Sequence, residues 1–305
     1  MALELSVIIC THNPRPDYLR RVLEALRTQT LPVDQWELIV VDNASEHSVA
    51  SRFDISWHPR GRHAREDELG LAYARQRGMR EALSELLVFV DDDNVLALDY
   101  LAEALNIRQE WPQLGVWGGS IVPEFEVEPP AHLTKYLRLL ALRKIDAPRW
   151  SNVATCADVE PWGAGLCVRS SVASAYRQHY RQSKIHLTGR SGTNLISGED
   201  MEICYVARAA SLGMGLFPEL TVTHLIPEAR LKEEYLVRLA QALHFSHLLL
   251  AFSWRGITPR SPFAGIELLR SIKNITTRRK LDRRVYLSNL RAVLQARATI
   301  AHAQK

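Results

Sequence analysis

The sequence predicts an α/β fold, with a mostly parallel sheet covered by helices on both faces and a helical C-terminal extension. Three runs of apolar residues, rich in β-branched side chains, have the length and composition of buried strands. They lie at residues 5–10, 36–41 and 86–90. Each run is followed by a stretch with apolar residues at helical spacing, and this alternation is typical of parallel sheets covered by helices.

The predicted elements continue along the chain in the same style. The helices that follow the three strands are predicted around residues 19–26, 69–83 and 99–111. A mixed segment at residues 116–132, with paired glycines and paired prolines, interrupts the pattern. The later α/β elements are a strand at 165–168, a helix at 199–212 and short strands near 216 and at 221–224. Long helices dominate beyond residue 231, so we expect a domain of residues 1–230 and a helical extension of residues 231–305.

The composition of the 305-residue chain is that of an ordinary globular protein, with 47% hydrophobic and 24% charged residues. A formal net charge of +4 suits phosphate-bearing substrates but falls short of a nucleic-acid-binding protein, so no nucleic acid partner is expected.

The four cysteines form no C-x-x-C pair, which argues against a structural zinc site or a disulfide framework. They are Cys10, Cys156, Cys167 and Cys204. The N-terminal apolar run is short and lacks a basic segment, and no apolar stretch reaches about 18 residues. We therefore expect a cytoplasmic protein with neither a signal peptide nor a spanning helix.

Polar clusters follow the three strongest strands at the point where each strand ends. They are Thr11-His12-Asn13, Asp42-Asn43 and Asp91-Asp92-Asp93. Ligands of parallel sheets bind beyond the carboxyl ends of the strands, so the three clusters are expected to face one crevice.

The three consecutive aspartates are the most informative of these clusters. Their mutual repulsion favours a bound cation, and hard carboxylate ligands suit Mg²⁺ or Mn²⁺. Such an ion would bridge two phosphates of a nucleotide and stabilise the charge on a leaving diphosphate. The alternative is a solvated acidic turn that caps the next helix.

Two further residues can be interpreted either as ligand-binding residues or as ordinary structural ones. Asp42 either accepts hydrogen bonds from a ribose or a base edge, or is a turn residue. Arg75, on a helix of otherwise small residues, either reaches a phosphate or a base or faces water. The turn after the first strand, residues 10–16, has no G-x-G-x-x-G pattern, which argues against a dehydrogenase.

The segment Ser197-Gly198-Glu199-Asp200 begins a predicted helix and also has two interpretations. In the first, Ser197 and Asp200 cap the helix by accepting hydrogen bonds from backbone amides. In the second, Asp200 is a general base that takes a proton from a hydroxyl group. His224, after a short strand, either completes a metal site or contacts a diphosphate, or packs as an ordinary residue.

Together these segments resemble the family 2 glycosyltransferases of the GT-A fold. The resemblance covers about residues 1–230 and rests on five segments in the same order. They are residues 6–13 (SVIICTHN), 37–45 (ELIVVDNAS), 74–78 (ARQRG), 90–94 (VDDDN) and 198–202 (GEDME). Gln76 stands where asparagine is usual, and an aspartate, Asp92, fills the variable middle of the metal motif. These departures leave open which two of the three aspartates face the ion.

The resemblance implies an inverting, metal-dependent transfer from a nucleoside diphosphate sugar, UDP ahead of GDP, to a hydroxyl of a glycan or lipid-linked acceptor in polysaccharide biosynthesis. It implies a donor nucleotide site of Thr11, His12, Asn13, Asp42, Asn43, Arg75 and Asp92. It implies a Mn²⁺ or Mg²⁺ site of Asp91, Asp93 and His224. Asp200 becomes the catalytic base beside Glu199, and the acceptor side includes Trp162, Gly163 and Arg190. Residues 190–193 are expected to form a mobile loop over the site.

The helical extension combines an apolar run at residues 248–252 with a basic cluster. The cluster comprises Arg270, Lys273, Arg278, Arg279, Lys280, Arg283 and Arg284. Helices of this character lie on anionic membrane surfaces, so a peripheral contact at the inner face of the membrane is one interpretation. The other is that the helices pack on the protein or on a second copy.

Two other functions fit part of the pattern. A nucleotidyltransferase also needs a metal and an α/β nucleotide site, but its first loop would be rich in glycine and basic residues, unlike residues 11–16. A non-catalytic module that binds nucleotide sugars or glycans is the third, although the intact Asp93 and Asp200 argue against it.

Overall fold

The structure is a computed structural model that describes residues 3–153, 157–192, 194–263, 267, 273–276 and 278–304. Cys156, Thr193 and Arg270 lie outside the described residues. The chain forms two compact units, and each is discontinuous in sequence. The first unit contains Met1–Glu126, Ala141–Gln182 and Glu199–Ile226. The second contains Val127–Leu140, Ser183–Gly198 and Pro227–Lys305.

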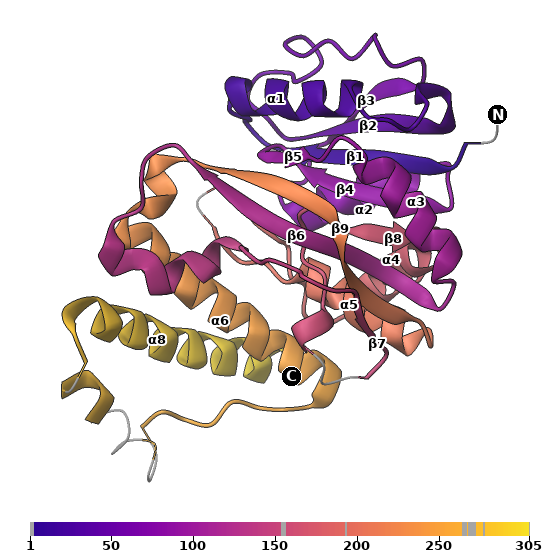
Figure 1. The fold of residues 1–305 in the computed structure, drawn as a ribbon. Helices are drawn as coiled ribbons and strands as arrows, with labels where there is room; N and C mark the ends of the chain where they lie inside the picture. Colours follow the sequence, from indigo (N-terminus) through magenta and orange to yellow (C-terminus); the bar gives the residue numbers. More distant parts are fainter. Residues whose placement is uncertain are drawn as a thin grey trace. The chain divides into compact units, whose positions relative to one another are not determined.

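The first unit is built on one sheet (Figure 1), whose described strands follow the order β3-β2-β1-β4-β8-β6-β9-β5, with β7 paired to β9. The strands are β1 (Leu5–Thr11), β2 (Trp36–Asn43), β3 (Gly61–Glu66), β4 (Leu86–Asp91), β5 (Asn94–Leu96), β6 (Leu114–Phe125), β7 (Arg149–Ser151), β8 (Cys167–Arg169) and β9 (Gly213–Ile226). Strands β3, β2, β1 and β4 are parallel, as are β6 and β9, whereas β8 runs antiparallel between the two groups. The predicted α/β fold with a mostly parallel sheet is confirmed.

The register of the sheet explains why polar groups gather at one edge. Every residue of β1 is buried, and the strand pairs in parallel with both β2 and β4. Thr11 is aligned with Asp42, and Cys10 with Asp91. Three apolar strands therefore end at the same edge of the sheet, and the residues that follow them lie close together.

Helices cover both faces because the side chains of β1 alternate. Val7 and Ile9 belong to a core with residues of α1 and α3, whereas the Ile8 side chain lies against Gly78 of α2. A Cβ at Gly78 would clash with Ile8 Cγ2, so the glycine permits this close approach. The helices of the unit are α1 (Pro16–Arg27), α2 (Leu71–Glu81), α3 (Tyr100–Glu110), α4 (Ser170–Gln182) and α5 (Glu199–Ala209).

Several strands differ from the prediction. β6 occupies the segment predicted as mixed, and the two short strands predicted near residue 216 and at 221–224 are one strand, β9. The short strands β3, β5 and β7 were not predicted; β3 carries polar residues and lies at the edge of the sheet, where apolar periodicity is weak.

The second unit is helical, as predicted for its C-terminal part. α6 (Glu233–Arg255) and α8 (Lys280–Ala303) pack along each other (Figure 1). Arg284 of α8 donates to Glu233 at 2.6 Å and to Glu234 at 3.0 Å, both in the first turn of α6. The short 3₁₀ segments of the chain are η1 (Val33–Gln35), η2 (Ala131–Leu140), η3 (Ala157–Val159) and η4 (Glu228–Leu231).

One helix of the described residues, Glu233–Arg255, is long and apolar enough to cross a membrane by length and composition alone. This differs from the expectation that no segment would qualify. About a third of the most apolar stretch of the helix is buried inside the protein. A core helix of a soluble protein passes the same test, so the finding is weak evidence for insertion.

Candidate active site

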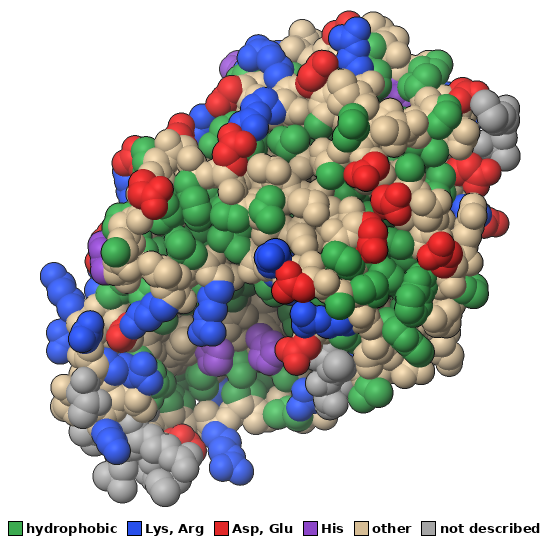
Figure 2. Space-filling model, viewed as in Figure 1, with side chains coloured by type: hydrophobic (Ala, Val, Ile, Leu, Met, Phe, Trp, Pro, Cys, Tyr) green, Lys and Arg blue, Asp and Glu red, His purple; other side chains and the backbone are tan. Residues whose placement is uncertain are grey.

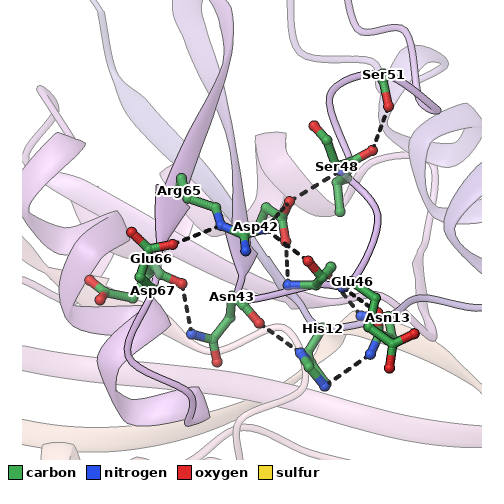
Figure 3. A network of polar contacts seen from close by, with 12 residues as sticks. His12, Asn13, Asp42, Asn43, Glu46, Ser48, Ser51, Arg65, Glu66 and Asp67 are labelled. Atoms are coloured by element: carbon green, nitrogen blue, oxygen red, sulfur yellow. Dashed lines mark hydrogen bonds and ion pairs between the residues drawn. The ribbon is translucent and has the colours of Figure 1, made fainter.

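The turn after β1 is tied to the end of β2 (Figure 3). His12 Nδ1 lies 2.7 Å from the Asn43 carbonyl oxygen, and the Asn13 amide donates to Ser45 Oγ at 2.9 Å. Asn13 adopts a left-handed backbone conformation with φ of 48°, which asparagine tolerates better than most residues. Its side-chain oxygen accepts from the Glu46 amide at 2.9 Å. The residues predicted to bind the donor nucleotide, His12, Asn13 and Asn43, thus form one hydrogen-bonded platform with Ser45 and Glu46.

Asn43 holds the neighbouring segments in place. Its Nδ2 donates to the carbonyl oxygens of Glu66 and Glu68 at 3.2 and 2.7 Å, and its Oδ1 accepts from the Gly70 amide at 2.8 Å. Both ends of its amide are therefore used by the backbone between β3 and α2. The structure gives Asn43 an organising role at the end of β2.

Asp42 is buried and accepts hydrogen bonds from two backbone amides and from an arginine. They come from the Ser45 amide (3.0 Å), the Val49 amide (3.1 Å) and Arg65 Nη1 (2.8 Å). Burial raises the pKa of Asp42, but the hydrogen bonds from Ser45, Val49 and Arg65 together bring it below its usual value. The carboxylate is therefore ionised, and it lines a pocket of about 530 Å³ between the β2 turn and β3.

Arg65 was not predicted from the sequence, although it belongs to the same site. It lies on β3, aligned with Asp42, and also lines the pocket. The strand itself was missed because its residues are polar. Only the pairing of β3 with β2 brings Arg65 to Asp42.

The three consecutive aspartates point to three different partners. Asp91 Oδ1 lies 3.4 Å from Arg75 Nη2, and Asp92 accepts a hydrogen bond from the Thr11 hydroxyl. The Asp93 carboxylate lies 3.5 Å from His224 Nε2. The backbone explains the last contact, because β5 pairs with β9 and aligns Asn94 with His224.

The described residues contain no group of three or more His, Cys, Asp and Glu side chains placed to hold a metal ion. The Asp93–His224 pair is the best match to the predicted metal site, since it offers an oxygen and a nitrogen donor side by side. Both side chains are almost fully buried. Asp91 instead faces a guanidinium group.

Arg75 lies deeper than the prediction implied, with only 2% of its surface exposed. Its Nη1 donates to Glu199 Oε1 at 3.1 Å, and its Nη2 donates to the Gly163 carbonyl oxygen at 3.4 Å. Burial lowers the pKa of Arg75, but the charges of Glu199 and Asp91 raise it overall, so the group stays charged.

Glu199 and Asp200 begin α5, as predicted. Asp200 Oδ1 accepts from the Met201 amide and its Oδ2 from the Gly163 amide, each at 2.9 Å. Glu199 is 3% exposed, and burial raises its pKa to about 7 although Arg75 opposes the shift. α5 therefore begins with two adjacent carboxylates, Asp200 partly open and Glu199 buried against an arginine.

The predicted acceptor-side residues are found in both units. Trp162 and Gly163 precede β8 in the first unit, and the Arg143 guanidinium lies 3.2 Å over the Trp162 ring. Arg143 was not predicted, because nothing local in the sequence marks its contact with Trp162. Arg190 belongs to the second unit, in a segment where Ser191 and Asn194 form a β-bridge.

Residues 6–180 match the family model described as glycosyl transferase family 2, more than half of the chain. The chain belongs to this family. The family assignment and the GT-A fold predicted from the sequence are both confirmed.

Curated relatives are distant. The chain is 22% identical over 203 residues to the putative glycosyltransferase EpsH of Bacillus subtilis, covering 61% of this chain and 57% of that protein. It is 22% identical over 135 residues to the glucosyl-dolichyl phosphate glucuronosyltransferase of Haloferax volcanii, covering 42% and 41% of the two chains. The chain thus spans less than two thirds of the length of either relative.

Solved structures with the same fold include two nucleotide-sugar complexes. One is the mannosyltransferase PcManGT of Pyrobaculum calidifontis with GDP-Man and Mn²⁺, at 21% identity and a TM-score of 0.55, covering 100% of this chain and 76% of that one. The other is S. aureus TarS with UDP-GlcNAc, at 11% identity and a TM-score of 0.54, covering 98% and 92%. At these identities the likeness shows the fold alone.

Proposed function

We propose that this protein is an inverting glycosyltransferase that uses a nucleoside diphosphate sugar. One observation supports this above all others: Arg75 contacts both Asp91, at the end of β4, and Glu199, at the start of α5. The expected diphosphate side of the site and the residue next to the expected base therefore meet at a single guanidinium group. Membership of family 2 supports the same reaction.

Asp200 is the proposed general base. It would accept the proton of the acceptor hydroxyl while the acceptor oxygen bonds to the anomeric carbon and the bond to the diphosphate breaks, which inverts that carbon. The hydrogen bonds from Met201 and Gly163 fix the carboxylate and leave lone pairs free to take a proton. The capping role is compatible, because a helix start favours an ionised carboxylate.

A divalent metal, Mn²⁺ or Mg²⁺, is the proposed cofactor. Asp93 and His224 would hold it, and the donor diphosphate would complete its coordination, since such ions often take only one or two carboxylates from the protein. Bound there, the ion would neutralise charge on the leaving diphosphate. The Mn²⁺ in the PcManGT complex supports this assignment.

The proposed donor nucleotide is UDP, with GDP as the alternative. Thr11, Asn13 and Asp42 are proposed to hold it. The related folds bind one nucleotide each, GDP-Man or UDP-GlcNAc. The pocket beside Asp42 has acceptors from Asp42 and Glu46 and a donor from Arg65, which suits the polar edge of a base or ribose.

Calorimetric titration of UDP and GDP, with and without Mn²⁺, tests the donor site. We expect one nucleotide to bind, and its affinity to fall at least tenfold without Mn²⁺ and in Asp93→Ala, because both changes remove charge neutralisation at the diphosphate. Asp146→Ala, an exposed aspartate paired with Lys144, is the control and should bind normally. If neither nucleotide binds under any condition, the proposed function is wrong.

We propose a lipid-linked saccharide as the acceptor, met at the cytoplasmic face of a membrane. One relative is named for a dolichyl phosphate substrate. Lys and Arg side chains gather over the part of the second unit where α8 lies (Figure 2). Arg284 is bound to Glu233 and Glu234 and so helps α8 pack, whereas Arg279, Lys280 and Arg283 are exposed.

Vesicle flotation tests the membrane contact. Each basic residue near an anionic surface contributes about 1 kcal/mol, so changing Arg279, Lys280 and Arg283 to Ser should weaken partition to phosphatidylserine vesicles about 100-fold. A control variant carries the same three changes at exposed arginines of the first unit, Arg27, Arg52 and Arg60. Equal binding by the two variants, or none by the unchanged protein, would contradict the membrane contact.

A further inference from the structure

A closed set of contacts surrounds the proposed base. Arg75 donates to Glu199 from Nη1 and to the Gly163 carbonyl oxygen from Nη2. Gly163 in turn donates its amide to Asp200. Arg75 is therefore connected to Asp200 in two ways. One is through Glu199, the preceding residue in the chain, and the other is through Gly163.

The burial of Arg75 and Glu199 argues against a direct contact with the donor. Their exposed fractions are 2% and 3%. To reach a nucleotide, the guanidinium would have to leave charged and polar partners inside the protein, and separating a buried ion pair is costly. The Phe89 ring, 5.5 Å away, also covers the group.

Position 163 has no room for a side chain beside Arg75. A Cβ at this position would clash with Arg75 Nη2 and lie 3.1 Å from Nη1. Any other residue at position 163 would therefore displace the guanidinium or move the chain that carries the amide bonded to Asp200. The preceding residue, Trp162, is held from its own side by Arg143.

The charges around Arg75 also favour a fixed position for its guanidinium group. Arg75 is the cation placed among Asp91, Glu199 and Asp200, and the negative charges of all three favour its charged form. Arg75 in turn opposes the effect of burial on the pKa of Glu199. A base must be correctly aimed to take a proton, and the contacts to Glu199 and Gly163 supply that orientation.

We propose that Arg75, Glu199 and Gly163 form a positioning unit that orients Asp200, and that Arg75 is a positioning residue instead of a donor ligand. This inference rests on the proposed function, because it takes Asp200 as the base. Arg75 fixes the first turn of α5 through Glu199, and it fixes the Gly163 amide through the carbonyl oxygen of the same residue.

The test separates binding of the nucleotide from turnover. The variants are Arg75→Lys, Gly163→Ala and Glu199→Ala, and the two readouts are the dissociation constant for UDP or GDP with Mn²⁺ and kcat for nucleotide release from UDP-GlcNAc or GDP-mannose. A displacement of about 1 Å at a reacting group costs about 100-fold in rate. We therefore expect kcat to fall about 100-fold while the dissociation constant changes less than about threefold.

Two variants guard against a general loss of structure. Glu199→Gln keeps an oxygen that accepts from Arg75, so it should recover at least tenfold of the rate lost in Glu199→Ala. Arg77→Lys, on the same helix but 35% exposed and paired with Glu81, should match the unchanged protein. Variants are compared only where their thermal unfolding is cooperative.

The outcomes also distinguish this inference from the proposed function. If Arg75→Lys weakens nucleotide binding tenfold or more, Arg75 is a donor ligand and the positioning role is overturned. If Asp200→Asn is inactive but Gly163→Ala and Glu199→Ala keep full kcat, the base stands and the positioning unit does not exist. If Asp200→Asn itself keeps full kcat, the proposed base is wrong and the inference falls with it.

Discussion

Replacing Asp200 with Asn should lower kcat for sugar transfer by about 10²–10⁴-fold, the usual contribution of a general base, while nucleotide affinity stays within about threefold. An amide has nearly the same shape as a carboxylate but does not take up the proton of the acceptor hydroxyl. The measurement is nucleotide release from UDP-GlcNAc and GDP-mannose in the presence of acceptor.

The geometry also predicts a small structural cost for this change. Each Asp200 carboxylate oxygen accepts a hydrogen bond from a backbone amide, one from Met201 and one from Gly163. Asn keeps only one of these two acceptors. The loss of one hydrogen bond costs about 1 kcal/mol, which leaves the variant folded. Asp146→Asn, at an exposed site, is the matched control. Full activity in the Asp200 variant would show that the base lies elsewhere.

Replacing Gly119 with Ala should lower the free energy of unfolding by about 3 kcal/mol, because no space exists for a methyl group. The added Cβ would clash with the Leu220 carbonyl oxygen and lie 2.6 Å from Leu220 Cβ and from the Phe217 carbonyl oxygen. Two of these three atoms are backbone of β9, which is held by its pairing with β6. The close approach occurs where the β6–β9 register shifts, between Gly119 and Ser120.

The neighbouring glycine supplies the control. A Cβ at Gly118 would lie 3.2 Å from Pro161 Cβ, so Gly118→Ala requires a shift of only a few tenths of an ångström. We expect it to change the free energy of unfolding by less than about 1 kcal/mol. Urea titration followed by circular dichroism compares the two, and equal midpoints would contradict the packing argument.

The three strongest strands and the gathering of polar groups at their ends followed from the sequence. The apolar strands that became β1, β2 and β4 are continuous and locally coded, so their ends were predictable within two residues. Parallel pairing then requires Thr11, Asp42 and Asp91 to emerge at one edge. The start of α5 was also marked locally, by the acidic pair at 199–200.

The tertiary structure alone decided the partner of each charged side chain. Three adjacent aspartates face Arg75, Thr11 and His224, because neighbouring residues at a strand end point in different directions. The burial of Arg75, the approach of Arg65 to Asp42, and the packing of residues 127–140 and 183–198 with the C-terminal helices depend on contacts between distant parts of the chain. Periodicity reports only which face of an element is apolar. It carries no information about which distant residues contact that element, and the chemistry of this site depends on those contacts.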